Sequence, residues 1–227
     1  QSMLDCGKER MALEEIILDD MSRSVPGDVT AFLERAETHI DAHFDAGKNK
    51  RYPQFIPCDS TLLYSVISFL TEEDHVSGET FCEWGSGLGV GVCLASKLGY
   101  EAYGIEIEEE LVEAAEVLAD EAGVEGVTFL PTSYIPEGLD SYSGVGGDEI
   151  VADSATFLGE AGNIFYEGMD CDVSEIDLFF VYPWPSEHEF MAELFDTIAS
   201  EGAVLIAYYG DGEICAYRKK YHSTVDS

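Results

Sequence analysis

The sequence predicts an α/β fold: a doubly wound, mostly parallel sheet with a helical extension at its N-terminus. Between about residues 80 and 217, short apolar runs alternate with amphipathic stretches, which is the pattern of strands joined by crossover helices. One run, 178–182, has five apolar residues in succession, as expected for a strand covered on both faces. A glycine-rich turn over 85–91 separates the first run from the next amphipathic stretch. The 227 residues suffice for one such domain with a short appendage.

The N-terminal region, residues 1–75, is expected to be helical and to pack on the core. The segment MALEEIILDDM, 11–21, predicts a short amphipathic helix. Between 28 and 45, apolar residues recur every four positions, which predicts a second helix with one apolar stripe. The stretch GKNKRYPQFIPCD interrupts this pattern, and Asp59 or Ser60 is expected to cap a third helix over 61–73.

The α/β domain is assigned to residues 76–227. Its predicted strands cover 80–84, 101–107, 126–131, 176–183, 202–210 and 213–220, and its predicted helices cover 90–99, 108–123 and 186–200. An insert at about 134–174 is rich in Gly, Ser and Asp and is too long for a plain connection, so we interpret it as a lid or substrate loop. Few residues follow the fifth strand, which predicts a shortened sheet.

Acidic residues dominate the charge of the chain. Asp and Glu number 46 against 11 Lys and Arg, for a formal net charge of −35. Such a surface repels phosphate backbones, so we expect no bulk nucleic-acid binding and interpret the acidity mainly as a means of solvation. Two basic clusters, 48–51 and 218–220, are compatible either with holding an anion or with local pairing to acids.

Membrane segments and metal sites are not predicted. No apolar run is long enough for a membrane-spanning helix. The six cysteines show no CxxC spacing, so a reducing, cytoplasmic compartment is the default expectation. His39 and His43, four residues apart on a predicted helix, are interpreted as surface or packing residues and not as metal ligands.

The glycine-rich turn is the most informative motif. The segment FCEWGSGLGVGV, 81–92, places Glu83 at the end of a predicted strand and glycines at 85, 87, 89 and 91. A dinucleotide fingerprint needs glycines at relative positions 0, 2 and 5, and the three registers here place Val90, Val92 or Leu94 at the last position. Glu83 would repel a pyrophosphate on this turn and would attract a ligand with a cationic end.

This motif resembles that of the class I S-adenosylmethionine-dependent methyltransferases, over about residues 78–210. Glu83, Gly85, Gly87 and Gly89 match the first motif of that family, and Glu106, 21 residues after Gly85, stands where the family binds the ribose hydroxyls. The resemblance implies a Rossmann-like methyltransferase fold and S-adenosylmethionine as cofactor. It implies these cofactor-binding residues: Glu83, Gly85, Ser86, Gly87, Gly89, Glu106, Ile107, Thr132, Ser133 and Tyr182. Thr132 and Ser133 stand where the family usually has an acid near the adenine.

The tip of the fourth predicted strand, FFVYPWPSEHE, is the expected place of methyl transfer. It resembles the Asp/Asn-Pro-Pro-aromatic motif of amino methyltransferases, but Tyr182 replaces the acid or amide, so an exocyclic base amine is not indicated. Tyr182 and Trp184 each precede a proline and are compatible with an aromatic floor for a flat or cationic substrate or with a lid over the cofactor. Tyr182 and His188 are the catalytic candidates, with His188 as a general base or merely part of a helix first turn.

The expected function is therefore the transfer of a methyl group from S-adenosylmethionine to a small molecule or a protein side chain. The segment 55–58, Phe-Ile-Pro-Cys, is loosely similar to a stretch of lysine-directed members of the family, which implies a basic protein as one possible acceptor. A non-catalytic cofactor-binding protein is the alternative from another class, and a dehydrogenase ranks third. The oligomeric state and the acceptor stay open.

Overall fold

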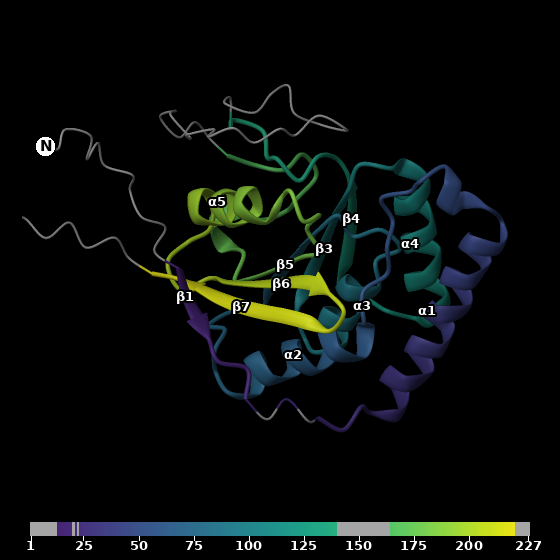
Figure 1. Cartoon of the computed structure of the whole chain (residues 1–227), viewed down its shortest axis with the longest axis horizontal. Helices are drawn as coiled ribbons and strands as arrows, with labels where there is room; N and C mark the ends of the chain where they lie inside the picture. Colours follow the sequence, from purple (N-terminus) through teal and green to yellow (C-terminus); the bar gives the residue numbers. More distant parts are fainter. Residues whose placement is uncertain (1–12, 20, 22, 140–163, 221–227) are drawn as a thin grey trace, which may run out of the picture.

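The computed structural model describes residues 13–19, 21, 23–139 and 164–220, and it confirms the predicted α/β fold. Seven strands form one sheet in the order β1-β7-β6-β5-β2-β3-β4 (Figure 1). Five neighbouring strands are parallel: β2 (Thr80–Trp84), β3 (Glu101–Glu106), β4 (Val127–Pro131), β5 (Leu178–Val181) and β6 (Val204–Gly210). At one edge, β7 (Glu213–Lys219) runs antiparallel to β6, and β1 (Leu13–Ile16) runs antiparallel to β7.

Helices cover the two faces of this sheet unequally. One hydrophobic cluster packs one face against α1 (Gly27–Asp45), α2 (Ser60–Glu72), α3 (Val90–Lys97) and α4 (Glu109–Ala122). The second cluster packs the opposite face against α5 (His188–Ile198) and the loop that contains the short helix η3 (Val173–Glu175). Figure 1 shows α5 on the other side of the sheet from α2, α3 and α4. We call these the four-helix face and the α5 face.

The order of the parallel strands creates a switch point between β2 and β5. The chain leaves β2 through α3 on the four-helix face, and it leaves β5 through α5 on the other face. In open α/β sheets a crevice forms where neighbouring strands diverge in this way, outside their carboxyl ends. Gly85 follows β2 and Tyr182 follows β5, and Trp84 pairs with Val181, so the two predicted site segments meet at this point.

The prediction of a helix over 11–21 is wrong. Leu13–Ile16 form the edge strand β1, in which Leu13 pairs with Lys219 and Ile16 with Ala216. The Lys220 ammonium lies 2.5 Å from the Glu14 carboxylate. Pairing with β7 satisfies backbone groups of an otherwise open edge, an interaction between distant segments that local periodicity does not reveal. The N-terminal region is thus not wholly helical. Because β1 and β7 extend the sheet to seven strands, the prediction of a shortened sheet is wrong.

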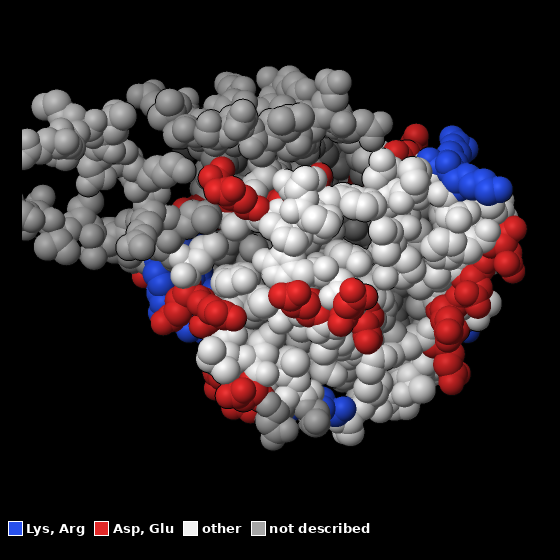
Figure 2. Space-filling view, in the orientation of Figure 1, with Lys and Arg blue, Asp and Glu red and all other residues white. Residues whose placement is uncertain are grey.

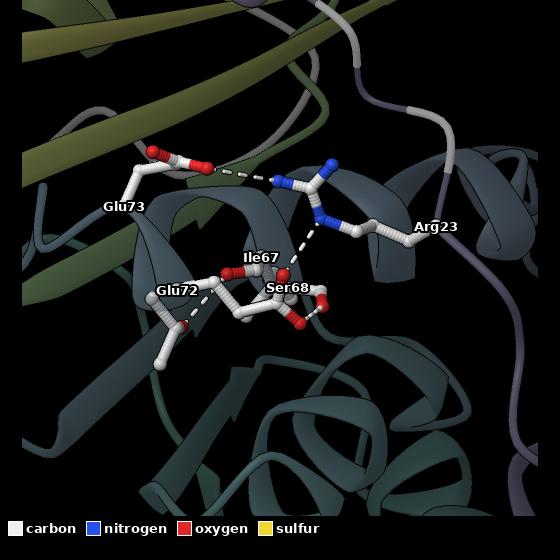
Figure 3. A network of polar contacts seen from close by, with 6 residues as sticks. Arg23, Ile67, Ser68, Glu72 and Glu73 are labelled. Carbon is white, nitrogen blue, oxygen red and sulfur yellow. Dashed lines mark hydrogen bonds and ion pairs between the residues drawn. The ribbon is translucent and has the colours of Figure 1, made fainter.

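The segment between β1 and α1 is tied to α2 by one arginine. Arg23 Nε donates to Glu72 at 2.7 Å and its Nη2 donates to Glu73 at 3.3 Å (Figure 3). Its guanidinium also lies 5.5 Å from the centre of the Phe69 ring. The Ser68 hydroxyl donates to Glu72 at 2.9 Å and orients that carboxylate. These contacts fix the path by which the chain crosses from the sheet edge to α1.

The two basic clusters have different surroundings. In the C-terminal cluster, Arg218 donates to the His75 carbonyl, Lys219 to carbonyls at the end of α5, and Lys220 pairs with Glu14, so this cluster has a structural role. The other cluster surrounds the 3₁₀-helix η1 (Lys48–Lys50), where Figure 2 shows a compact basic group on a face whose other charged groups are mostly acidic. Its Arg51 pairs with Glu110 at 2.5 Å.

Part of the predicted insert is defined. Glu137 and Phe165 form an antiparallel bridge, and the Tyr166 hydroxyl donates to the Tyr134 carbonyl at 2.6 Å. Residues 140–163 lie outside the described residues, so the predicted role of the insert as a lid or substrate loop stays a prediction. Within the described ranges, no helix is long and apolar enough to cross a membrane.

Candidate functional site

The glycine loop between β2 and α3 adopts a backbone that needs glycine at three positions. Gly85, Gly87 and Gly89 have φ values of 74°, 52° and 71°. The amides of Gly85 and Ser86 both donate to the Ile105 carbonyl, at 2.8 and 2.9 Å, which folds the loop back onto β3. Side chains are strained in this left-handed region, so the alternating glycines allow the chain to turn sharply at the switch point.

The same loop also approaches its neighbours closely. A methyl group at Gly87 would lie 2.7 Å from the Phe55 ring, and one at Gly89 would lie 2.4 Å from the Phe129 ring. At Gly85, by contrast, a methyl group would meet no atom within 4 Å. The loop is therefore closely packed at Gly87 and Gly89 and open to solvent at Gly85.

Glu83, in β2, is buried beneath the start of α3. Its side chain accepts a hydrogen bond from the Val92 amide at 3.0 Å, and a methyl group at Gly91 would lie 2.7 Å from the same oxygen. Burial raises the pKa of Glu83 well above its usual range, and the charge of Glu106 raises it further. A negative charge at this position is therefore costly unless a donor or cation arrives to match it.

Glu106, the last residue of β3, holds the other side of the loop. It accepts hydrogen bonds from the Gly87 amide at 2.9 Å and from the Glu108 amide at 3.0 Å. Burial raises the pKa of Glu106 despite these amides, which act in the opposite direction. The structure thus brings Glu83 and Glu106 together around one glycine loop, as the sequence predicted.

The remaining predicted cofactor residues flank this centre. Ile107 follows Glu106 and is 63% exposed. Glu106 pairs with Pro131, which places Thr132 and Ser133 just beyond the next strand, at the same edge of the sheet. The Ser133 hydroxyl accepts a hydrogen bond from the Ile135 amide at 3.1 Å and so closes a local turn. The hydroxyl of Ser86 is buried and has no hydrogen-bond partner among the described residues.

Two tyrosines at the carboxyl ends of β5 and β6 pack together, and we call this pair the aromatic wall. The rings of Tyr182 and Tyr208 meet edge to face with centres 4.8 Å apart, and both pack on the four-helix face. Burial raises the pKa of Tyr182, and so does Tyr208. Burial and the charge of Glu83 raise the pKa of Cys58 to about 12, which keeps this thiol neutral. The sequence indicated Tyr182, but nothing local to the motif indicated that Tyr208 packs against it.

A second aromatic group lies behind the loop. The prediction that His43 is a surface or packing residue is confirmed as packing, whereas its contact with Phe55 was not predicted. Phe55, which touches Gly87, has its ring centre 5.0 Å from that of His43 on α1. Phe44 and Tyr52 also contact the His43 ring, at centre distances of 6.0 and 6.2 Å. Burial lowers the pKa of His43, and the charge of Lys48 lowers it further. The neutral imidazole therefore serves as one of the packing rings.

His188, the other catalytic candidate, is not part of this site. Its ring packs against Tyr209 at a centre distance of 4.5 Å, and Tyr209 belongs to the α5 face. Tyr182 packs on the opposite face of the sheet. Tyr208 and Tyr209 are consecutive residues of β6, so their side chains point to opposite faces of the sheet. Tyr182 and His188, which pack against them, are therefore separated by the sheet.

The described geometry limits what the site can do. It offers two buried carboxylates, an open glycine backbone and a neutral tyrosine wall, an arrangement that suits a ligand with hydroxyl groups and a cationic end. Among the described residues, no group of three or more His, Cys, Asp or Glu side chains forms a candidate metal site.

Comparisons with known proteins found solved structures that are similar to this chain over most of its length. No family model and no curated protein matches the chain. It is similar to an RNA methyltransferase from Salinibacter ruber solved with S-adenosyl-L-homocysteine, at 19% identity over 76% of this chain and 100% of that one, with a TM-score of 0.46. A methyltransferase from Geobacter sulfurreducens has 12% identity, 88% and 94% coverage and a TM-score of 0.49. An S-adenosylhomocysteine-bound methyltransferase from Podospora anserina has 13% identity, 82% and 63% coverage and a TM-score of 0.48. Because these TM-scores are below 0.5, the site assignment rests on this chain's own residues.

Proposed function

We propose that this chain is an S-adenosylmethionine-dependent methyltransferase. The observation that carries the proposal is the convergence of two buried carboxylates, Glu83 and Glu106, on one glycine loop. Burying carboxylates without a cation is unfavourable, so their presence favours a ligand that donates hydrogen bonds and carries positive charge. A phosphate-bearing dinucleotide fits this charge poorly.

The residues of the site fit the cofactor. Glu106 would accept the two ribose hydroxyls, Glu83 would face the cationic amino acid end, and Ile107 would offer an exposed apolar surface to the base. The open backbone at Gly85 and the unpartnered Ser86 hydroxyl provide further polar contacts. When bound, the cofactor supplies a methyl group on an activated sulfonium.

The protein's own part would be to position the acceptor and to exclude water. Tyr182 and Tyr208 form a wall at the switch point, where an acceptor would approach. The raised pKa of Tyr182 keeps its phenol neutral at pH 7, so this group would orient the acceptor and would not remove a proton. The neighbouring carboxylates favour an amine acceptor, such as a small amine or the lysine side chain of a basic protein, which would lose its proton to solvent before its nitrogen lone pair attacks the methyl group.

One observation favours the second candidate, a cofactor-binding protein without turnover. The expected base, His188, packs on the other face of the sheet from Tyr182. Methyl transfer to an acceptor that arrives deprotonated needs no base, so turnover itself decides between the two candidates.

Calorimetry tests the proposal directly. S-Adenosylmethionine and S-adenosylhomocysteine should bind the unaltered chain, whereas NAD should not. Glu106→Ala should weaken cofactor binding at least about tenfold, because it removes charge-assisted hydrogen bonds of about 1.5–3 kcal/mol each. Glu109→Ala, an exposed acid at the start of α4, is the matched control and should leave binding unchanged.

A second assay separates the two candidates. The chain is incubated with methyl-labelled cofactor and either a basic protein mixture or a set of small amines. Label on an acceptor supports the enzyme, whereas binding without label on any acceptor supports the non-catalytic alternative. No binding of the cofactor by the unaltered chain would reject both.

A further inference from the structure

The α5 face contains a cavity that the proposed methyl-transfer site does not use. It has a volume of about 400 Å³ and lies between the start of α5 and strands β1, β5, β6 and β7. Val181 and Leu205 line it from the sheet, and Met191 lines it from α5. Val181 and Leu205 belong to the cluster opposite the one that contains Tyr182, so the sheet separates this cavity from the glycine loop.

The size of this cavity departs from ordinary packing. Protein interiors have few voids larger than a water molecule, whereas small-molecule sites have volumes of about 300–1,000 Å³. Residues of α5 and of β1, β5, β6 and β7 all line the cavity. The cavity is partly open to solvent, and its volume falls within the range of small-molecule sites.

The polar groups of the cavity define the chemistry that it can bind. His188 Nε2 is shielded from solvent and has no hydrogen-bond partner among the described residues. Glu15, on β1, lines the same cavity, and no Lys or Arg lies among its lining residues. A shielded ring nitrogen is rarely left without a hydrogen-bond partner, so His188 Nε2 favours a polar group on a bound molecule. Glu15 is exposed to solvent, and its carboxylate favours a donor or a cation.

We propose that this cavity binds a small, mostly apolar molecule that carries one amino or hydroxyl group, with His188 and Glu15 as its polar partners. Aliphatic and tyrosine side chains would surround the apolar body of the molecule. The proposal is independent of the proposed methyl transfer, since it uses other residues on the other face of the sheet.

Two naphthalene probes test this chemistry on the full chain. Naphthylmethylamine and naphthylacetate share a ring system and differ in charge, and their binding is followed by fluorescence and by calorimetry. The amine should bind at least tenfold more tightly than the acid. Equal affinity for both probes, or no binding of the amine, would overturn the proposal.

Variants then locate the bound probe. Ala192→Trp should fill the cavity and weaken amine binding at least tenfold, and His188→Leu should weaken it several-fold. Glu189→Trp, which adds the same side chain at an exposed position of α5, is the matched control and should change nothing. If Ala192→Trp does not fold, the effect of His188→Leu and the comparison of the two probes still test whether the cavity binds the amine.

Two further outcomes would also reject the proposal. Displacement of the amine probe by S-adenosylhomocysteine would place it in the glycine-loop site, which would leave the proposed function intact while this inference fails. Binding that occurs only after removal of residues 1–12 would show that this segment of the chain fills the cavity. Persistence of amine binding in the full chain with excess S-adenosylhomocysteine present supports the proposal.

Discussion

The two faces of one sheet handle polar groups differently. The buried polar and charged side chains of the described residues lie on the four-helix face or in its helices: His43, Ser68, Glu83, Ser86 and Glu106. The buried side chains of the cluster on the α5 face are apolar, aromatic or cysteine. Burying a charge without a partner is costly, so this segregation indicates that the free energy of unfolding is lowered on the four-helix face, where the proposed cofactor would compensate for the cost.

The largest expected effect comes from Gly87→Ala. The left-handed φ of 52° costs about 1–2 kcal/mol for a non-glycine residue, and the contact with Phe55 adds about 1–3 kcal/mol of overpacking. Chemical denaturation measures the loss. Gly123→Ala is the control, because it has a similar φ of 61° and open space around the new methyl group. Equal destabilisation by the two variants would show that Phe55 does not pack firmly on the loop.

Glu83→Gln is expected to raise the free energy of unfolding in the absence of cofactor, by less than Gly87→Ala lowers it. The raised pKa of Glu83 means that its ionisation opposes folding as pH rises above 4.5, its ordinary value. Glutamine keeps an acceptor for the Val92 amide without the charge, so the variant should gain roughly 1–3 kcal/mol at pH 7, the cost of an uncompensated buried group.

Thermal unfolding of both chains at pH 4 and pH 7 checks this expectation. The gain should shrink towards pH 4, where the carboxyl group is protonated, and the variant should lose affinity for S-adenosylmethionine at pH 7. A variant that is less stable at both pH values would contradict the comparison of the two faces, because Glu83 would then stabilise the fold by itself.

The smallest expected effect is the contribution of His43 to the pH dependence of stability. Its lowered pKa means that the unfolded chain binds more protons than the folded one below the ordinary value of 6.5, so this group lowers stability as pH falls through that value. His43→Phe keeps a packing ring and removes the titration. The stability difference between pH 7.5 and pH 5.5 should therefore be smaller in the variant, by at most about 1.4 kcal/mol per pH unit. Identical profiles of stability against pH for the unaltered chain and for His43→Phe would contradict this expectation. They would mean that a partner stabilises the protonated His43 imidazole in the folded chain.

The sequence predicted the centre of the site because that centre is local. Glu83 and its glycines form one continuous segment, and Glu106 ends the next strand, so parallel pairing alone brings them together. The contact of Phe55 with Gly87 was not predictable, since it joins a loop before α2 to the turn after β2. His188 was misplaced relative to Tyr182 because the sequence did not reveal which side of the sheet α5 would cover. The cavity depends on how far α5 extends over the strands, which no local pattern encodes.

The pairing of β1 with β7 has a consequence for biosynthesis. Leu13 belongs to the first described strand to leave the ribosome, whereas its partner Lys219 ends the last one. β1 therefore stays unpaired while the rest of the sheet assembles, and it pairs with β7 in a late, non-local step. Nascent chains arrested before Glu213 should consequently expose a sheet margin that chaperones can recognise.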